Sequence, residues 1–282
     1  MPVVRTLNDI LCMSAFAGEV SMDYTRVTVE RREHVLLMGL NRPDKMNAFD
    51  YDMFLELAHV YGVLDRDPDL WCGVLFAHGA HFTSGLEMDK WAKVFADGNM
   101  GIPAGSIDPL GCDEDKRCRK PVVMAAAGRC YTIGFELLLA QDIRVAASDV
   151  RLALLEVKRG IYPAGGGTVR LFEEIGWGNA MRFLLTGNEI DSAEAYRLGL
   201  VQEVVEPSRV VERAYEIARD ISKRAPLAVQ AALRSARIAR VEGPKAAMAR
   251  LYPDLMPIIK SEDALEGIMS FMQRREANFK GK

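Results

Sequence analysis

Short apolar segments predict a series of β-strands in the first two thirds of the chain. They fall at Arg26–Glu30, His34–Leu40, Cys72–Ala77, Val122–Ala126 and Ile143–Ala146. Between the second and third of these, the apolar residues of Tyr51–Leu64 recur at helical spacing, which predicts an amphipathic helix. Strands that alternate with crossover helices are typical of an α/β fold.

The pattern changes near Ser192, after which strand-like segments fade and amphipathic helical patterns follow. Asp191 and Glu194 form a plausible capping box for one helix, and Ser261 precedes another. No low-complexity linker separates the two parts. The sequence therefore predicts an N-terminal extension at residues 1–21, an α/β core at 22–191 and a helical C-terminal region at 192–282.

Composition and charge exclude several classes of protein. Hydrophobic residues make up 49% of the 282 residues and charged residues 27%, an ordinary balance for a globular protein. No apolar run approaches the roughly 20 residues that cross a bilayer, and the net charge of −3 argues against a broad nucleic-acid surface. Five cysteines without a CxxC pair fit reduced thiols, so we expect a cytoplasmic protein without membrane or nucleic-acid partners.

Two glutamates are candidates for acid–base chemistry. Glu136 lies in an almost wholly apolar segment, where an ionised carboxylate is costly unless it is paired or its pKa rises. A solvent-facing position or a structural ion pair would explain it equally well. Glu156 precedes the glycine run Gly165–Gly167 at the start of a predicted helix, where backbone N–H groups can approach a ligand or another backbone segment closely.

A second glycine-containing turn follows the predicted strand Cys72–Ala77. Its sequence, Gly79 to Met88, would place backbone amides at a helix N-terminus, where they can bind an oxyanion. His78 and His81 have no third ligand at suitable spacing, so we expect no metal site. The chain also lacks a GxSxG elbow, which leaves a serine hydrolase with little support.

Several motifs occur in the order in which the crotonase (enoyl-CoA hydratase/isomerase) family carries them. From about Arg26 to the C-terminus, the chain resembles this family. The motifs are Asn41–Ala48, Phe82–Glu87, Pro121–Gly128, Glu136, Asp142–Ala147, Glu156–Thr168, Leu184–Gly187, Gly199–Val201 and a final helix at Phe271–Lys282. The resemblance implies the ClpP/crotonase fold, a spiral of β-β-α units with a helical C-terminal trimerisation region. It also implies a homotrimer or a hexamer built as a dimer of trimers.

The resemblance also implies a coenzyme A thioester substrate and assigns roles to particular residues. Glu136 and Glu156 fall on the acid–base positions of enoyl-CoA hydratases, and the backbone N–H groups of Leu86 and Ile133 fall on the oxyanion hole. The residues placed near coenzyme A are Lys45, Asn47, Ala48, Ser84, Phe279 and Lys282, the last two of which could come from the same or a neighbouring subunit. No cofactor is implied, because coenzyme A is part of the substrate.

Three positions depart from the family pattern. Ile133 replaces a glycine, Leu86 replaces a small residue and Glu87 replaces an aspartate, which indicates a pocket for a different acyl group. The glycine-rich loop Asp97–Asp115 is a candidate wall of that pocket. The expected function is hydration of a 2-enoyl-CoA. Enoyl-CoA isomerisation, another crotonase-type lyase or hydrolase reaction, and a non-catalytic acyl-CoA-binding or RNA-binding scaffold are the alternatives.

Overall fold

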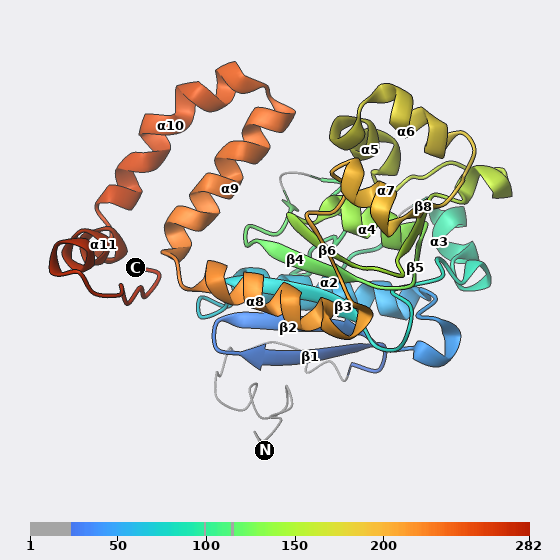
Figure 1. Cartoon of the computed structure of the whole chain (residues 1–282), viewed down its shortest axis with the longest axis horizontal. Helices are drawn as coiled ribbons and strands as arrows, with labels where there is room; N and C mark the ends of the chain where they lie inside the picture. Colours follow the sequence, from blue (N-terminus) through green and yellow to red (C-terminus); the bar gives the residue numbers. More distant parts are fainter. Residues whose placement is uncertain (1–23, 99, 114–115) are drawn as a thin grey trace.

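The protein is an α/β structure built on a six-stranded sheet, as the computed structural model shows for residues 24–98, 100–113 and 116–282 (Figure 1). The expected extension at 1–21 lies outside these residues. The strand order is β1-β2-β3-β4-β6-β9, with β1 antiparallel to β2 and all other neighbours parallel. The strands are β1 (Val27–Arg32), β2 (Val35–Leu40), β3 (Cys72–Ala77), β4 (Val122–Ala126), β6 (Ile143–Ala147) and β9 (Glu203–Val205).

Helices cover both faces of this sheet. On one face α2 (Tyr51–Arg66) packs against alternate residues of β2, among them Leu36 and Met38. On the other face α8 (Val210–Ser222) covers the intervening residues, Val35 and Leu37. Every residue of β2 is therefore buried, which is why its sequence reads as a continuous apolar run.

A smaller sheet and a group of short helices lie at one side of the main sheet (Figure 1). The sheet contains β5 (Arg129–Tyr131), β7 (Arg151–Ala153) and β8 (Ile190–Asp191). The α-helices there are α3 (Ala92–Asp97), α4 (Ile133–Ala140), α5 (Gly167–Ile175), α6 (Trp177–Leu184) and α7 (Ser192–Arg197). The 3-10 helices with bounds in the described residues are η1 (Pro43–Lys45), η2 (Met88–Lys90), η4 (Glu156–Arg159) and η5 (Pro207–Arg209). All eight residues of α4 are buried, so the functional groups that it carries are shielded from water.

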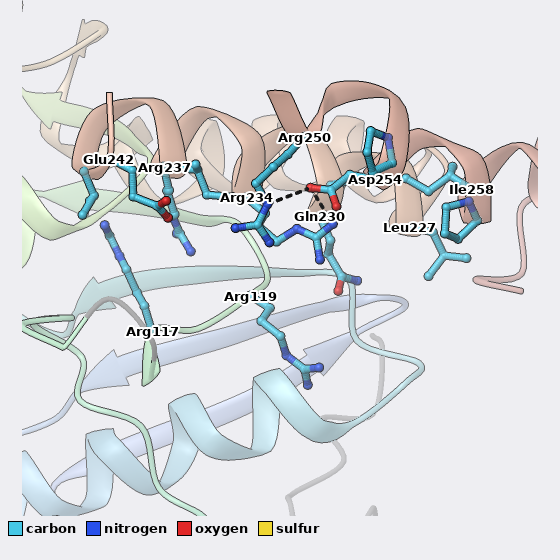
Figure 2. Close-up of a pocket in the computed structure, with 15 residues that line it drawn as sticks. Arg117, Arg119, Leu227, Gln230, Arg234, Arg237, Glu242, Arg250, Asp254 and Ile258 are labelled. Carbon is cyan, nitrogen blue, oxygen red and sulfur yellow. Dashed lines mark ion pairs between the residues drawn. The ribbon is translucent and has the colours of Figure 1, made fainter. Parts of the chain in front are cut away.

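Three helices form an arm that extends away from the sheet. They are α9 (Pro226–Val241), α10 (Pro244–Ile259) and α11 (Glu262–Gln273), and α9 and α10 lie side by side (Figure 1). A cleft of about 760 Å³ separates this hairpin from the body of the protein, and most of its charged groups are arginines (Figure 2). Arg119, Arg234 and Arg237 are each paired with a carboxylate. None of the predicted site residues lines this cleft.

The main elements agree with the sequence patterns, with two differences. The predicted strands match β1, β2, β3, β4 and β6 to within two residues at their ends, whereas β5, β7, β8 and β9 were not predicted. β9 lies beyond Ser192 yet pairs with β6, so the main sheet continues into the region expected to be helical. In the described ranges, 24–98, 100–113 and 116–282, no helix is long and apolar enough to span a membrane.

The predicted final helix at Phe271–Lys282 is wrong. α11 ends at Gln273, because Arg274 adopts a left-handed conformation with φ 53°. The tail then returns to the start of the same helix, where the Asp263 carboxylate accepts hydrogen bonds from the backbone N–H groups of Lys280 and Gly281 at 2.7 and 2.8 Å. Hydrogen bonds from the tail to Asp263 therefore replace the helical hydrogen bonds that the local pattern suggested.

Candidate active site

Glu136 lies in the first turn of α4, with its side chain directed into the protein. It is only 5% exposed, and its Oε1 accepts hydrogen bonds from the backbone N–H groups of Gly165 at 2.6 Å and Gly167 at 3.1 Å. Burial raises the pKa of Glu136 to about 7, although the Gly167 and Gly165 amides and the positive charge of Arg170 oppose this rise. A carboxyl group with a pKa near neutrality can both accept and release a proton at physiological pH.

Glycine is required beside Glu136 because the carboxylate of Glu136 approaches the backbone of this run too closely for a larger residue. A Cβ on Gly165 would lie 2.7 Å from Glu136 Oε2, and a Cβ on Gly167 would lie 3.2 Å from Oε1. The sequence predicted that amides of this run approach a ligand or backbone. Those of Gly165 and Gly167 instead hold the carboxylate of Glu136, which is a role that the sequence pattern did not reveal.

Glu156 is the first residue of η4 and is also buried, at 8% exposure. Burial and, to a smaller extent, the negative charge of Glu136 raise its pKa to about 7, although a hydrogen bond from its own backbone N–H opposes this rise. The two carboxyl groups therefore lie close enough to interact electrostatically. Among the described residues, Glu156 Oε2 has no hydrogen-bond partner, which leaves this oxygen available to a water or a substrate.

The two predicted oxyanion donors, Leu86 and Ile133, follow turns that contact each other. Thr83 forms a bridge with Cys130, and a Cβ on Gly85 would lie 2.5 Å from the hydroxyl oxygen of Thr132. Leu86 directly follows Gly85, and Ile133 directly follows Thr132. Within the described part of the chain, the N–H group of neither Leu86 nor Ile133 donates a hydrogen bond to a protein acceptor. The structure thus brings together two neighbouring turns, each of which carries an unused backbone donor.

The unusual backbone conformation at this site belongs to Thr132 and not to Ile133. Thr132 has φ 50° and ψ −115°, which is strained for a β-branched residue and costs about 1–3 kcal/mol. Its hydroxyl oxygen is buried and has no partner among the described residues. Ile133 begins α4, is 4% exposed and packs within the main apolar core. The backbone restriction that the sequence suggested at Ile133 therefore falls one residue earlier.

Four of the predicted coenzyme A residues lie together beside the Gly85 turn. The Ser84 N–H group donates to Met46 O at 3.0 Å, and the Lys45 ammonium lies 3.2 Å from Glu87 Oε1. Ala48 lies in the same segment and is a hydrogen-bond acceptor for Arg42. Of these residues, Lys45 has the most exposed side chain, at 54%, and is the one best placed to meet an anionic ligand from solvent.

Asn47 has a structural role for its side chain. Its Nδ2 donates to His78 O and His81 O, both at 2.8 Å, and its Oδ1 accepts from Arg42 N at 2.7 Å. Its backbone oxygen also accepts from the Thr83 hydroxyl at 2.6 Å. Its backbone N–H also donates to Arg42 O at 2.9 Å. Because these bonds use both ends of the fully buried amide and the backbone N–H, Asn47 braces the turn before Leu86 and has no N–H donor left for a ligand.

Phe279 and Lys282 lie far from the other predicted site residues of the same chain. A Cβ on Gly281 would lie 3.9 Å from the indole nitrogen of Trp71, which immediately precedes β3. The Gly85 turn follows the opposite end of β3. The tail therefore sits at the wrong end of the strand to share a ligand with Glu136 of its own chain, and a role for it in binding would require another copy.

The loop between α3 and β4 contacts the Glu136 site. The Leu110 Cδ1 atom would lie 3.0 Å from a Cβ on Gly165, and Gly111 O accepts a hydrogen bond from Arg170 at 2.7 Å. The thiol of Cys112 is also within electrostatic range of Glu136, since the charge of Glu136 contributes to raising the pKa of Cys112 to about 11, mainly an effect of burial. The role of this loop as a wall of an acyl pocket stays a prediction, and its position agrees with that role.

The pKa of Glu136 has a consequence for stability. The carboxyl group ionises near pH 4.5 in an unfolded chain and near 7 in the folded protein, so between these values the folded state binds more protons and the free energy of unfolding falls as pH rises. Glu136→Gln removes this effect. As the pH rises from 5 to 8, we therefore expect the free energy of unfolding of the variant, measured relative to that of the wild type, to increase by about 2–3 kcal/mol. Urea denaturation at both pH values, at one protein concentration, measures this change, and a pH-independent difference would contradict it.

Comparison with known proteins identifies the relatives of this chain. The profile of the enoyl-CoA hydratase/isomerase family matches residues 30–282. Enoyl-CoA hydratase EchA19 of Mycobacterium tuberculosis is 34% identical over 259 residues, which cover 90% of this chain and 96% of that protein. (E)-benzylidenesuccinyl-CoA hydratase of Thauera aromatica is 32% identical over 266 residues, covering 90% of this chain and 99% of the relative.

A solved structure gives the same result for the fold. A probable enoyl-CoA hydratase/isomerase from Mycobacterium abscessus superposes with a TM-score of 0.90 at 43% identity, and the match covers 92% of this chain and 100% of that one. The predicted crotonase-like α/β fold is therefore confirmed. Together these matches show that the chain belongs to the enoyl-CoA hydratase/isomerase family, the crotonase family that its sequence motifs resemble.

Proposed function

We propose that this protein is an enoyl-CoA hydratase that adds water across the C2–C3 double bond of a 2-enoyl-CoA thioester, with Glu136 and Glu156 as the acid–base pair. The observation that carries the proposal is the pairing of two buried carboxyl groups, each with a pKa raised to about 7, beside two turns with unused backbone donors. Relatives named as hydratases support the same reaction.

The reaction needs three functions, and the chain offers a group for each. One carboxylate accepts a proton from the attacking water, while the other carboxyl group delivers a proton to C2. Negative charge develops on the thioester oxygen as the enolate forms, and the N–H groups of Leu86 and Ile133 stabilise it. The loss of one donor of this kind typically costs about 2.7–4 kcal/mol of transition-state stabilisation. No cofactor takes part, since coenzyme A is carried by the substrate.

The acyl group of the substrate is the part that the relatives leave open. Their names include both an enoyl-CoA hydratase and an (E)-benzylidenesuccinyl-CoA hydratase, whose acyl group is aromatic and carries a carboxylate. Leu86 and the loop residue Leu110 are apolar groups at the site that can select among acyl chains. In this proposal Lys45, Ala48 and Ser84 face the coenzyme A moiety in a cytoplasmic enzyme, and Asn47 holds their segment in place.

Mixing the purified protein with crotonyl-CoA tests the proposal directly. Hydration removes the conjugated enoyl-thioester absorbance and gives a product heavier by one water in mass spectrometry. An isomerase would instead convert 3-butenoyl-CoA to the conjugated thioester without a change of mass. If crotonyl-CoA and a bulkier aromatic enoyl-CoA are bound but neither gains water, the hydratase proposal fails. If neither is bound, a scaffold function replaces it.

We also propose that the enzyme assembles as a homotrimer or as a dimer of trimers through its C-terminal arm. Several large apolar side chains of α10 and α11 are exposed in the single chain. They include Met248, Leu251, Tyr252, Leu265, Ile268, Phe271 and Met272. Burying such side chains stabilises an interface. Sedimentation velocity is expected to give a trimer or hexamer, and Tyr252→Glu with Phe271→Glu should shift it to smaller species. A monomeric wild type would contradict the proposal.

A further inference from the structure

Arg170 on α5 is a buried cation that forms no ion pair with any residue that the structure describes. It is 7% exposed, and within the described ranges no carboxylate lies within salt-bridge distance of its guanidinium. Arg144, which is 4% exposed, provides a contrast because it pairs with Glu174 at 3.0 Å. A buried charge is costly unless it is compensated, so the position of Arg170 calls for an explanation in terms of its neighbours.

The guanidinium of Arg170 joins two segments that meet at Glu136. Its Nη2 donates to Gly111 O at 2.7 Å, and its Nη1 donates to Gly165 O at 3.3 Å. It also lies against Gly166, where a Cβ would be 2.5 Å from Nη1. The residues on either side of Gly166 are those whose amides hold Glu136. Arg170 therefore fixes the glycine run on one side while Glu136 is bound on the other.

Arg170 also carries the positive charge that acts on Glu136. Among the described residues, the other titratable groups that interact electrostatically with Glu136 are Glu156 from η4 and Cys112 from the loop, and neither is a cation. Arg170 favours the ionised form of Glu136, whereas burial disfavours it. The hydrogen bonds and the packing of Arg170 thus act on the glycine run that binds Glu136, and its charge acts on Glu136 itself.

We propose that Arg170 is a positioning residue, which holds the amide cradle of Glu136 against the Gly111 segment of the loop and supplies the positive charge that this carboxylate faces. The proposal deepens the hydratase function and rests on it for its kinetic test. It also makes a claim about the folded protein that does not depend on the reaction.

The kinetic test compares Arg170→Gln, which keeps a polar side chain but loses the charge, with Arg170→Lys, which keeps the charge. In the pH profile of kcat for crotonyl-CoA hydration, one limb reports the ionisation of Glu136. Arg170→Gln should raise the apparent pKa of that limb by about one pH unit. Arg170→Lys should lower kcat with a smaller shift. The control, Arg144→Gln, removes a buried arginine that pairs with Glu174 and should leave the limbs in place. A uniform loss of kcat without a shift in Arg170→Gln would overturn the proposal.

A double-mutant cycle on stability tests the same coupling without any assay of activity. Arg170→Gln should destabilise the protein more at pH 8 than at pH 5 in the Glu136 background, because an ionised Glu136 then loses its cation. In the Glu136→Gln background, this pH dependence should disappear. If it persists unchanged, Arg170 does not act on Glu136. If Arg170→Gln does not fold, Arg170→Lys in both backgrounds gives the comparison, with a smaller difference expected. A protein that shows the coupling but does not hydrate enoyl-CoA would keep this proposal and refute the proposed reaction.

Discussion

Glu136→Gln and Glu156→Gln are each expected to lower kcat for hydration of a 2-enoyl-CoA by a factor of roughly 10²–10⁴. Glutamine has nearly the same shape as glutamate but cannot exchange a proton at neutral pH, so each variant removes one half of the acid–base pair. In the Glu136→Gln variant, the side-chain carbonyl oxygen can still accept hydrogen bonds from the backbone N–H groups of Gly165 and Gly167, which keeps the local structure. Steady-state kinetics and the affinity for a saturated acyl-CoA separate chemistry from binding.

Glu174→Gln is the matched control for this pair. Glu174 is a partly buried glutamate on α5, but it pairs with Arg144 and Arg240 instead of facing Glu136. We expect it to lose stability and to keep its kcat. Full activity in Glu156→Gln together with inactivity in Glu136→Gln would contradict a two-carboxylate hydratase and would favour a reaction that needs one proton shuttle, such as isomerisation.

Gly85→Ala is expected to lower kcat by a factor of roughly 10²–10³, as the loss of an oxyanion donor does. Gly85 has φ 109°, a conformation that alanine rarely adopts, and its new Cβ would lie 2.5 Å from the Thr132 hydroxyl. Both effects displace the Leu86 N–H group that follows, so the effect should fall on kcat more than on KM.

Two further variants separate the clash from general backbone strain. Gly199→Ala tests strain alone, because Gly199 has φ 79° but no neighbour within 4 Å of its Cβ position. It should lower the melting temperature and keep kcat. Thr132→Gly in the Gly85→Ala background removes the clash and the strained threonine together, so it should restore part of the activity. No recovery in this double variant would mean that the position of Leu86 does not depend on the contact with Thr132.

The central strands of the main sheet, β2, β3, β4 and β6, were predictable because they are largely buried on both faces. β3 and β4 read as uninterrupted apolar runs, and their predicted bounds are those observed. β5, β7, β8 and β9 contain only two or three residues each, too few for any periodic pattern. These strands exist because of pairing between distant segments, such as Val145 with Glu203, and this pairing is not encoded in local sequence.

Burial within the candidate site was predictable where a residue type is itself unusual in its surroundings. A glutamate in the apolar segment of Glu136 stood out in the sequence, and the structure buries it. The partners of Glu136 did not stand out. Which way the Gly165 and Gly167 amides point depends on backbone torsions, and the contacts of Arg170 depend on a loop more than fifty residues earlier, at Gly111. Likewise, the sequence around Asn47 does not reveal that its side chain has a structural role and does not contact a ligand.

The neighbouring turns that precede Leu86 and Ile133 also bear on how the protein folds. Leu86 is bridged to Phe49, and Thr83 is bridged to Cys130, so three segments that are distant along the chain meet there. Closing such long loops costs entropy before any contact repays it, and parallel pairing of this kind is slow. The helices of the arm, in contrast, rely largely on local contacts. During refolding, helical circular dichroism should therefore return early, whereas enzymatic turnover should return only when the parallel sheet has closed.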